Sequence, residues 1–534
     1  MNNKNTTLVL IALIVALGGF LMGFDASVIS GVNKFITIEF GLSDIELGWA
    51  VASLTLSSTL AMFVAGPLSD RHGRKRMLTI AAILYAISAA GSAIAPSFLF
   101  LVIARMIGGI GVGFSLILAP MYIAELAPPE MRGRLVSFNQ LNIVIGISVA
   151  FFTNYLILQL GKSDASWAQS LKFNEYNWRW MLGLEALPAI LYFLGLNFVP
   201  RSPRWLMMKG KFDQAMEIMT RAGGKMPDIK QQVEDVKASL AGTGGEASKN
   251  YLDLLKPALR FVLVIGIVVG AMQQLTGINS VFFYAPMIFE QSGAGEDASF
   301  TQAILVGLIN LVFTILAILF IDRLGRKPLL VTGVAGIVLC MSFLSYQFAQ
   351  ATYTMTDKSF EVFTTVPDGE TDPPISPETV ALLQDFKGQT FDNDVAFKDA
   401  LREKVGKDEF KKIESTVITN SIENLNSNLV LAAVLGFVAF FAVSIGPVMW
   451  VLFSELFPNY IRGIAISFVG FINSGVSFLV QLVFPWELNS LGNSMTFLIY
   501  GLLCAAGLIF VILVVPETKG KSLEELEAML VKEK

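Results

Sequence analysis

Long apolar runs constrain the fold of this chain more than any other feature of its sequence. Each holds about 20 residues, the length that an α-helix needs to cross the hydrocarbon of a bilayer. Of the 534 residues, 54% are hydrophobic and 15% are charged, and the mean hydropathy is +0.62, which is typical of an all-α integral membrane protein. We count twelve runs: 8–31, 46–68, 77–95, 98–122, 135–158, 180–199, 259–289, 302–321, 329–350, 430–453, 464–485 and 494–515.

Arginine and lysine gather in alternate loops between these runs, for example at Arg74 to Arg76, at Arg132 and at Arg326. By the positive-inside rule these loops are cytoplasmic, so both termini are predicted to be cytoplasmic in a plasma (inner) membrane. The first run starts close to Met1 and is too long for a cleaved signal peptide, so we interpret it as a retained helix.

Two pairs of motifs reveal an internal repeat. D-R-H-G-R-K begins at Asp70 and D-R-L-G-R-K begins at Asp322, 252 residues later. E-L-A-P-P-E-M-R-G at 125–133 matches E-L-F-P-N-Y-I-R-G at 455–463, at a separation of 330. Repeats of this kind predict two pseudo-symmetric six-helix halves, 1–199 and 258–515.

The change in separation means that about 78 residues were gained between the two motifs of the second half. The acidic stretch 351–428 supplies them, and because it follows the ninth run it is predicted to be extracytoplasmic. Helix-like spacing over 376–423 predicts a small helical cap, with a solvated loop as the alternative. Amphipathic stretches predict short helices in a cytoplasmic linker at 200–257, and 516–534 is predicted to be a cytoplasmic tail.

Polar amides interrupt the seventh run in the stretch G-A-M-Q-Q-L-T-G-I-N, at Gln273, Gln274 and Asn279. An unpaired amide in hydrocarbon costs several kcal/mol, so these side chains need polar partners. On a straight helix Gln274 and Asn279 would lie roughly 140° apart, but Gly277 between them allows the helix to unwind. Amides turned toward one cavity favour a neutral, hydroxyl-rich ligand, and the alternative is polar packing between helices.

One carboxylate lies inside the first run. Asp25 would cost at least about 2.5 kcal/mol there as a bare charge, so it is expected to be paired or protonated. Arg105, in the fourth run, is the natural partner. A static ion pair that only joins two helices is the alternative to a functional role.

The order of these motifs, together with P-R-S-P-R-W-L, G-P-V-M-W and P-E-T-K-G, resembles the sugar porters of the major facilitator superfamily. The resemblance covers nearly the whole chain except 351–428, and it is strongest to bacterial proton-linked xylose and hexose symporters. It implies a central sugar cavity, with a helix break near Gly446–Pro447. The implied sugar ligands are Gln140, Gln273, Gln274, Asn279, Asn310 and Trp450. The implied proton-coupling residues are Asp25 and Arg105. The implied cytoplasmic gate is Arg74, Glu125, Arg132, Arg326, Glu455 and Arg462.

We therefore expect a monosaccharide:proton symporter that works by alternating access. A facilitative uniporter and a non-transporting sugar sensor are the alternatives. An integral membrane enzyme is a weaker alternative still, because it would need a nucleophile, metal or acid-base cluster and the runs contain no His, Cys or paired-carboxylate constellation. The expected partners are a small sugar, a proton and the lipid bilayer, with no nucleic acid, cofactor or metal, and the chain is expected to be a monomer. Departures from the family pattern at Ile147, Phe283 and Asn473 leave the particular sugar open.

Overall fold

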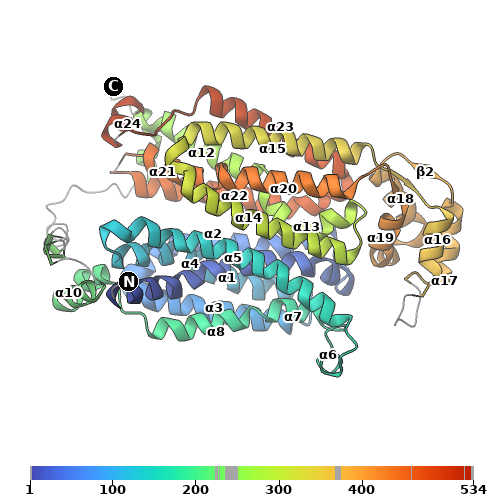
Figure 1. Cartoon of the computed structure of the whole chain (residues 1–534), viewed down its shortest axis with the longest axis horizontal. Coiled ribbons are helices and arrows are strands. Elements are labelled where there is room, and N and C mark those ends of the chain that lie inside the picture. The colour runs from blue at the N-terminus through green and yellow to red at the C-terminus, as the bar shows by residue number, and fades with distance from the viewer. Residues whose placement is uncertain are drawn as a thin grey trace.

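The computed structural model describes residues 3–222, 226–227, 229–231, 233–234, 251–366, 374–458, 460–521 and 523–530. Within these residues, twelve helical segments are long and apolar enough to cross a membrane, which confirms the predicted fold class. Figure 1 shows them running side by side along the long axis of the molecule. Helices α10 and α24 and both chain ends lie at one end, which we call the terminal face, and the insert lies at the other, which we call the insert face.

The N-terminal half supplies six of these segments. The sixth consists of two helices that meet at Leu184–Glu185, whereas the sequence predicted one uninterrupted run. The helices are α1 (Asn3–Glu39), α2 (Asp44–His72), α3 (Arg74–Ala93), α4 (Phe98–Leu126), α5 (Pro129–Gly161), the short α6 (Ser166–Ser170), α7 (Asn177–Gly183) and α8 (Ala186–Asn197).

The C-terminal half supplies the other six, two of which are broken. They are α12 (Arg260–Leu275) with α13 (Ile278–Gln291), α14 (Glu296–Leu324), α15 (Arg326–Ala349), α20 (Ser427–Val443) with α21 (Ile445–Leu456), α22 (Arg462–Ser490) and α23 (Asn493–Leu513). The predicted break in the tenth span is confirmed, but it lies at Ser444, with φ −122° and ψ −103°, two residues before the predicted Gly446–Pro447. Pro447 lies in the first turn of α21, where its missing N–H leaves no hydrogen bond unmade.

The repeated D-R-x-G-R-K motif makes the same turn in both halves. Gly73 separates α2 from α3 and Gly325 separates α14 from α15, each with φ +93°. L-residues rarely adopt this conformation, so glycine is required at both turns. The sequence repeat is therefore also a structural repeat.

Three helix pairs join the halves: α1 with α13, α2 with α22, and α5 with α14. The backbones approach closely where Gly48 of α2 meets α22. A Cβ added to Gly48 would lie 2.0 Å from the carbonyl oxygen of Leu482, so only glycine allows this packing. Gly48 lies near the insert-face end of α2, and the halves are therefore tightly packed at that end.

The insert is a folded unit, which we call the cap (residues 351–426). A three-stranded antiparallel sheet of order β2-β1-β3 is built from β1 (Thr352–Thr354), β2 (Thr390–Phe391) and β3 (Ile422–Glu423). Around it lie α16 (Asp357–Thr364), α17 (Pro377–Leu383), η3 (Gln384–Phe386), α18 (Asp394–Val405) and α19 (Lys407–Ser421). Tyr353, Phe363 and Phe397 are almost fully buried in its core. The predicted helices are confirmed, and the sheet was not predicted.

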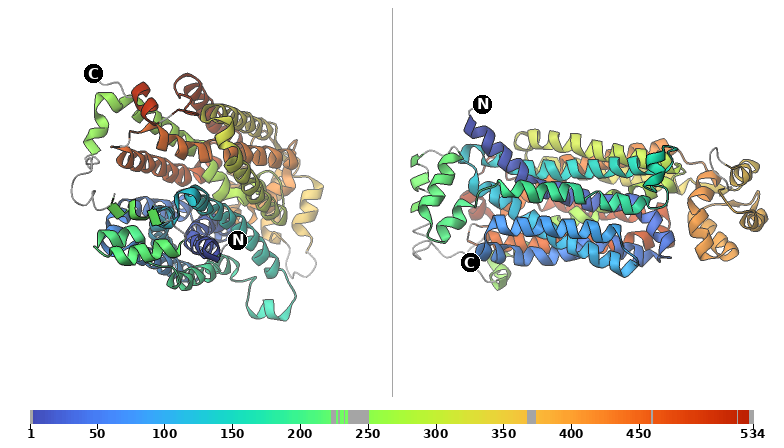
Figure 2. Two further views of the ribbon diagram at one scale, coloured as in Figure 1. Left: turned by 60° about the vertical axis from the view of Figure 1, so that its left-hand side comes forward. Right: turned by 90° about the horizontal axis from the view of Figure 1, so that it is seen from below.

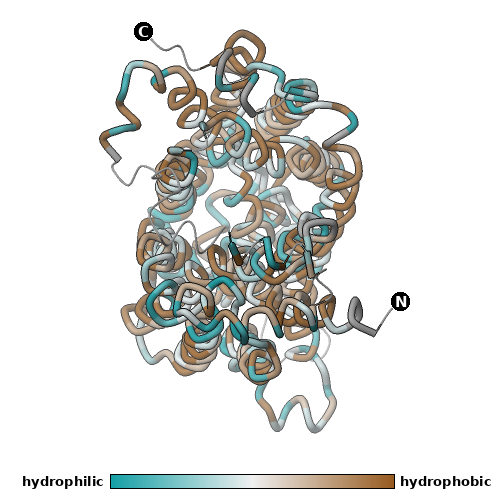
Figure 3. Tube along the Cα trace, turned by 90° about the vertical axis from the view of Figure 1, so that its left-hand side faces the viewer, coloured by the Kyte–Doolittle hydropathy of each residue, from teal (hydrophilic) through white to brown (hydrophobic). Residues whose placement is uncertain are grey.

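Two further regions lie at the terminal face (Figure 2). The linker contains α9 (Pro203–Met208), α10 (Phe212–Arg221), η1 (Tyr251–Leu255) and η2 (Pro257–Leu259), and the tail contains α24 (Leu523–Leu530). Residues 235–250 of the predicted linker are outside the described residues. Viewed from the terminal face, the rim of the bundle is mostly hydrophobic (Figure 3), as expected for a surface that contacts lipid.

Candidate functional site

The predicted helix break in the seventh span is confirmed. Helix α12 ends at Leu275 and α13 begins at Ile278, with Gly277 between them in the left-handed conformation at φ +83°. A Cβ on Gly277 would also lie 3.3 Å from the ring of Tyr500. The break places Gln273 and Gln274 at the end of one helix and Asn279 at the start of the next.

The amides from both sides of the break converge with polar residues of α22. Gln274 Nε2 donates to Gln273 Oε1 at 3.1 Å and to Asn473 Oδ1 at 3.2 Å. Asn279 Nδ2 donates to Gln274 Oε1 at 2.8 Å and to Ser477 Oγ at 2.7 Å. We call these five residues the amide network. In this state the amides hydrogen-bond to one another and to Ser477 across packed helices. Such bonding is expected both of polar packing between helices and of a binding site.

Among the described residues, the Gln273 side chain makes four hydrogen bonds, which extend beyond the network. Its Nε2 donates to the carbonyl oxygens of Gly446 at 3.2 Å and Ile445 at 3.4 Å, and its Oε1 accepts from both Gln274 and Asn473. An amide has two donors and two acceptor sites, so the capacity of Gln273 is used. In this state Gln273 ties the network to the start of α21 and orients the other amides.

The structure places the other three predicted ligands on other helices. Asn310 on α14 is 5% exposed and Trp450 on α21 is 45% exposed, and Gln140 on α5 is exposed. Among the described contacts, none joins these three residues to the amide network.

Asp25 and Arg105 form the predicted ion pair. Arg105 Nη1 lies 3.3 Å from Asp25 Oδ1, and Arg105 Nε donates to the carbonyl oxygen of Ala50 at 2.8 Å. Both side chains are about 1% exposed. Gly108 makes room for the pair, because a Cβ there would lie 2.9 Å from Asp25 Oδ2.

A second carboxylate, Glu185, lies beside this pair, and the sequence reading missed it. Glu185 lies at the junction of α7 and α8, is 2% exposed and interacts electrostatically with both Asp25 and Arg105. Within the described residues, Glu185 Oε1 and Asp25 Oδ2 have no hydrogen-bond partner. Arg105 is therefore paired directly with Asp25, and the second buried carboxylate interacts with both charges. The signal was present in the sequence, since Glu185 interrupts the sixth apolar run just as Asp25 interrupts the first.

The predicted cytoplasmic gate residues lie at the terminal face. Arg74 pairs with Glu125 at 3.1 Å within the N-terminal half, and Arg326 pairs with Glu455 at 2.8 Å within the C-terminal half. Arg462 Nε donates to the carbonyl oxygen of Phe457 at 3.0 Å. The side chain of Arg132 is outside the described residues. Each described pair thus clamps two helices of one half.

Ion pairs that join the two halves lie at the insert face instead, and these were not predicted. Lys34 on α1 lies 2.8 Å from Glu296 and 3.6 Å from Glu290. Lys162, at the end of α5, lies 2.7 Å from Asp297 and 3.5 Å from Glu296. We call these contacts the insert-face ion pairs. They close the insert face in this structure.

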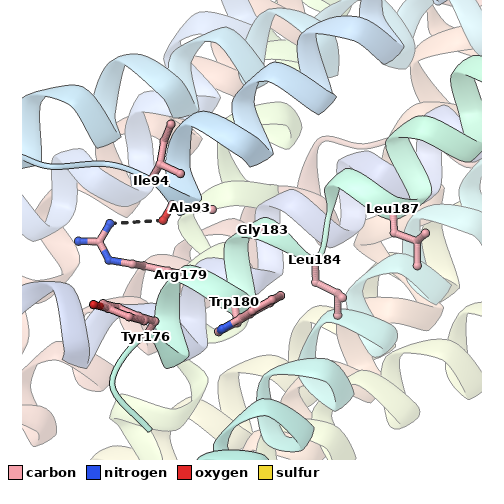
Figure 4. Close-up of a pocket in the computed structure, with 8 residues that line it drawn as sticks. All are labelled: Ala93, Ile94, Tyr176, Arg179, Trp180, Gly183, Leu184 and Leu187. Carbon is pink, nitrogen blue, oxygen red and sulfur yellow. Dashed lines mark hydrogen bonds between the residues drawn. The ribbon is translucent and has the colours of Figure 1, made fainter. Parts of the chain in front are cut away.

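A pocket of about 550 Å³ lies away from these residues, between the ends of α3 and α7 (Figure 4). Its polar groups are satisfied internally: Arg179 Nη1 donates to the carbonyl oxygens of Ala93 and Ala95, and Trp180 Nε1 donates to that of Leu171. The lining contains none of the predicted ligands, so this pocket is not the candidate site. The lining residues are Ala93, Ile94, Tyr176, Arg179, Trp180, Gly183, Leu184 and Leu187.

Comparison with known families and proteins agrees with this architecture. The family model described as "Sugar (and other) transporter" matches residues 11–366 and 413–530, and it omits the middle of the cap. The chain is 36% identical over 554 residues to the D-xylose-proton symporter of Escherichia coli (strain K12), covering 97% of this chain and 95% of that protein. It is 32% identical over 524 residues to the arabinose-proton symporter of Bacillus subtilis (strain 168), covering 98% and 95%.

Solved structures show the same likeness. The inward open conformation of the xylose transporter XylE from E. coli superposes with a TM-score of 0.71 at 33% identity, covering 97% of this chain and 99% of that one. The proton:xylose symporter XylE bound to 6-bromo-6-deoxy-D-glucose superposes with a TM-score of 0.67 at 33% identity, covering 98% and 100%. The closed insert face of this chain agrees with its similarity to the inward open form.

Proposed function

Because the chain belongs to the sugar transporter family, a family of membrane transporters and not of enzymes, we propose that it carries a monosaccharide together with a proton by alternating access. The observation that supports proton coupling is the buried group of Asp25, Arg105 and Glu185, in which Arg105 pairs with Asp25 and Glu185 interacts electrostatically with both. A uniporter needs no titratable group in its membrane core, and burying such a group is costly.

The orientation of the chain belongs to this proposal. The arginine-rich turns, including those with Arg74 and Arg326, lie at the terminal face, which favours a cytoplasmic position for both termini in the inner membrane. The insert face is closed while the overall structure is similar to an inward open transporter, which supports the same assignment. We take the working unit to be a monomer, since one chain contains both halves and the residues of the candidate site.

The sugar would bind by exchanging hydrogen bonds with the amide network. A hydroxyl can both donate and accept, so it can replace the bonds that Gln274 and Asn279 make in this state with little loss of pairing. The exposed indole of Trp450 offers an apolar face to the C–H side of a sugar ring. Gln140 and Asn310 would complete the site from α5 and α14, and Gln273 would orient it.

The proton would be held by the buried charge group. With both carboxylates ionised the group carries a net charge of −1 in a low-dielectric interior, and one bound proton makes it neutral. A proton arriving from the outer side would weaken the Asp25–Arg105 pair and shift the balance between the two faces. Loss of the proton on the inner side would restore the pair.

The ion pairs at the two faces differ in what they connect, and we infer different roles for them in the transport cycle. The insert-face ion pairs join the halves and must break for the cavity to open outward. The pairs Arg74–Glu125 and Arg326–Glu455 hold helices within each half. In the predicted outward-facing state, these clamped helix ends, together with Arg132 and Arg462, would meet and close the cytoplasmic side.

The proposal is tested in proteoliposomes that contain the purified protein. Counterflow with a panel of pentoses and hexoses identifies the sugar, and uptake with an imposed inward proton gradient measures coupling. Accumulation of at least one monosaccharide above its external concentration, abolished by a protonophore, is the expected result. Counterflow without accumulation would replace the symporter with a uniporter, and the absence of counterflow with every sugar would reject transport of monosaccharides.

A further inference from the structure

One hydrogen bond between side chains crosses from the N-terminal half directly to the residues beside the amide network. Thr55 Oγ1 on α2 donates to Gln481 Oε1 on α22 at 2.9 Å. The side chain of Gln481 is fully buried. Both residues lie on the insert-face side of the midpoints of their helices, where α2 and α22 pack across the interface between the halves.

This bond continues into the amide network without interruption. Gln481 Nε2 donates to Ser477 Oγ at 2.7 Å, and Asn279 Nδ2 donates to the same oxygen at 2.7 Å. Asn279 in turn donates to Gln274 Oε1 at 2.8 Å. We call Thr55, Gln481, Ser477 and Asn279 the interface relay, because they connect a hydroxyl of one half to a candidate sugar ligand of the other.

The geometry leaves the Gln481 side chain few alternatives. Its backbone carbonyl oxygen accepts from Tyr284 Oη at 2.9 Å, which holds this turn of α22 against α13. Ser477 Oγ already accepts two hydrogen bonds, which fills both of its lone pairs. If Thr55 moves away, the buried Gln481 Oε1 loses its partner, and a buried acceptor without a partner is strongly disfavoured. Gln481 must then rotate, and Ser477 and Asn279 lose their present arrangement.

We propose that Gln481 is a positioning residue through which the closed insert face sets the arrangement of the sugar-binding amides. The proposal rests on the proposed sugar transport. When the insert face is closed, the Thr55–Gln481 bond holds Ser477 and Asn279 as observed, and this arrangement defines the affinity on the cytoplasmic side. When the insert face opens, α2 separates from α22, the bond breaks, and the amides take up a second arrangement with its own affinity.

The test compares the two sides of the membrane in Thr55→Val, which removes the hydroxyl and keeps the shape. Thr59→Val is the matched control, because the Thr59 hydroxyl on the same helix donates to the carbonyl oxygen of Thr55 within α2. Sugar KM is measured from the outer face in intact cells and from the inner face in inverted vesicles, both in exchange mode. We expect the inner-face KM of Thr55→Val to rise about 3-fold or more, while its outer-face KM stays near that of the unmodified protein.

Two more variants make the result decisive. Thr55→Ser restores the donor and should recover the inner-face KM. Gln481→Met should reproduce the Thr55→Val effect, and the double variant should be no worse than Gln481→Met alone. Equal changes on both faces, or equal effects of Thr55→Val and Thr59→Val, overturn the relay while sugar transport itself stands. If the unmodified protein exchanges no monosaccharide, the proposed function fails instead.

Discussion

The N-terminal half and the C-terminal half hold their terminal ends together in the same way. In each, an arginine that follows the repeated turn pairs with the glutamate of the second motif: Arg74 with Glu125, and Arg326 with Glu455. Each glutamate also accepts a hydrogen bond from a hydroxyl. Ser202 donates to Glu125 in the first half, and Thr518 donates to Glu455 at 2.5 Å in the second.

The interiors of the halves differ in their chemistry. The N-terminal half buries Asp25, Arg105 and Glu185, whereas the C-terminal half buries the neutral amide network. A charge group can change its state by binding a proton, and an amide network can change its partners by binding a hydroxyl-rich ligand. Under the proposed function the N-terminal half would hold the proton and the C-terminal half the sugar, so coupling between them would have to cross the interface between the halves.

The largest effect is expected from removing Arg105, the cation that pairs with Asp25 in the buried charge group of the N-terminal half. Arg105→Leu leaves two buried carboxylates without a counter-charge, which should destabilise the protein by about 3–5 kcal/mol and abolish accumulation. The triple variant with Asp25→Asn and Glu185→Gln makes the group neutral and should recover most of the thermal stability in detergent. If the triple variant were no more stable than Arg105→Leu, the unpaired buried carboxylates would not be the cause of the lost stability.

Removing one carboxylate tests whether the N-terminal half is the proton site. Asp25→Asn mimics the protonated state, so it should retain sugar counterflow and lose uphill uptake driven by a proton gradient. Comparison with Glu185→Gln shows which carboxylate exchanges the proton, and Asp213→Asn, on exposed α10, is the control. If Asp25→Asn and Glu185→Gln both concentrate sugar in response to the gradient, the charge group is a static ion pair.

Truncating an amide tests the C-terminal half as the sugar site. Gln274→Ala leaves hydroxyls of the sugar unpaired, which costs roughly 1–3 kcal/mol, or about 5- to 150-fold in Kd. Proton coupling of any residual transport should be unchanged. Gln302→Ala on α14 removes an amide of the same size outside the network and is the control. Calorimetry that returns an unchanged Kd for Gln274→Ala would leave the network as polar packing only.

The cap is an element that the C-terminal half has and the N-terminal half lacks. Deleting residues 356–423 and bridging with a short Gly-Ser linker is feasible because Thr352 pairs with Glu423 at the base of the cap. Asp394 of the cap accepts from the backbone N–H of Asn493 at the start of α23, so its loss should cost about 0.5–2 kcal/mol. Transport should persist with a lower thermal midpoint. Complete loss of transport in a correctly inserted protein would make the cap part of the outer gate.

The smallest effect on stability is expected at Glu517, a position at the terminal face where the two halves carry different residues. Glu517 accepts from the backbone N–H groups of Arg326 and Lys327 at 3.1 Å and so caps α15, whereas the matching V-P-R-S segment of the first half carries Arg201. Partial burial raises the pKa of Glu517, but backbone donors outweigh it, and the pKa lies below its ordinary value.

A lowered pKa means that ionised Glu517 stabilises the folded state above the ordinary carboxyl pKa of about 4.3, and that this stabilisation is lost as the pH falls through the folded value. Glu517→Gln should therefore lower the thermal midpoint slightly at pH 7, by an effect of about 0.3–1 kcal/mol, and the difference should shrink toward pH 4. Arg201→Glu should raise the thermal midpoint by a similar amount, because it would place a capping carboxylate near the start of α3. A difference that grows on acidification would contradict the capping role.

Several features of the molecule were predictable from local sequence. The twelve spans follow from hydropathy, which is summed over neighbouring residues and needs no knowledge of the fold. The break at Gly277 was predictable because only glycine readily adopts the conformation observed there. The Asp25–Arg105 pair was predictable because a charge in an apolar run needs a partner, and few were available. The same rule applies to Glu185, which interrupts the sixth run.

Other features were decided only by the tertiary structure. Asn473, Ser477 and Gln481 lie on one face of α22, yet nothing in their spacing says that they meet Gln273, Gln274 and Asn279 about 200 residues earlier. The insert-face ion pairs join residues more than 100 positions apart. Sequence by itself determined which segments enter the membrane and which residues must find partners there, because both depend on the local cost of transfer into hydrocarbon. Which partners they found, and therefore which face of the protein is closed, depends on how separate helices pack, and only the assembled fold contains that information.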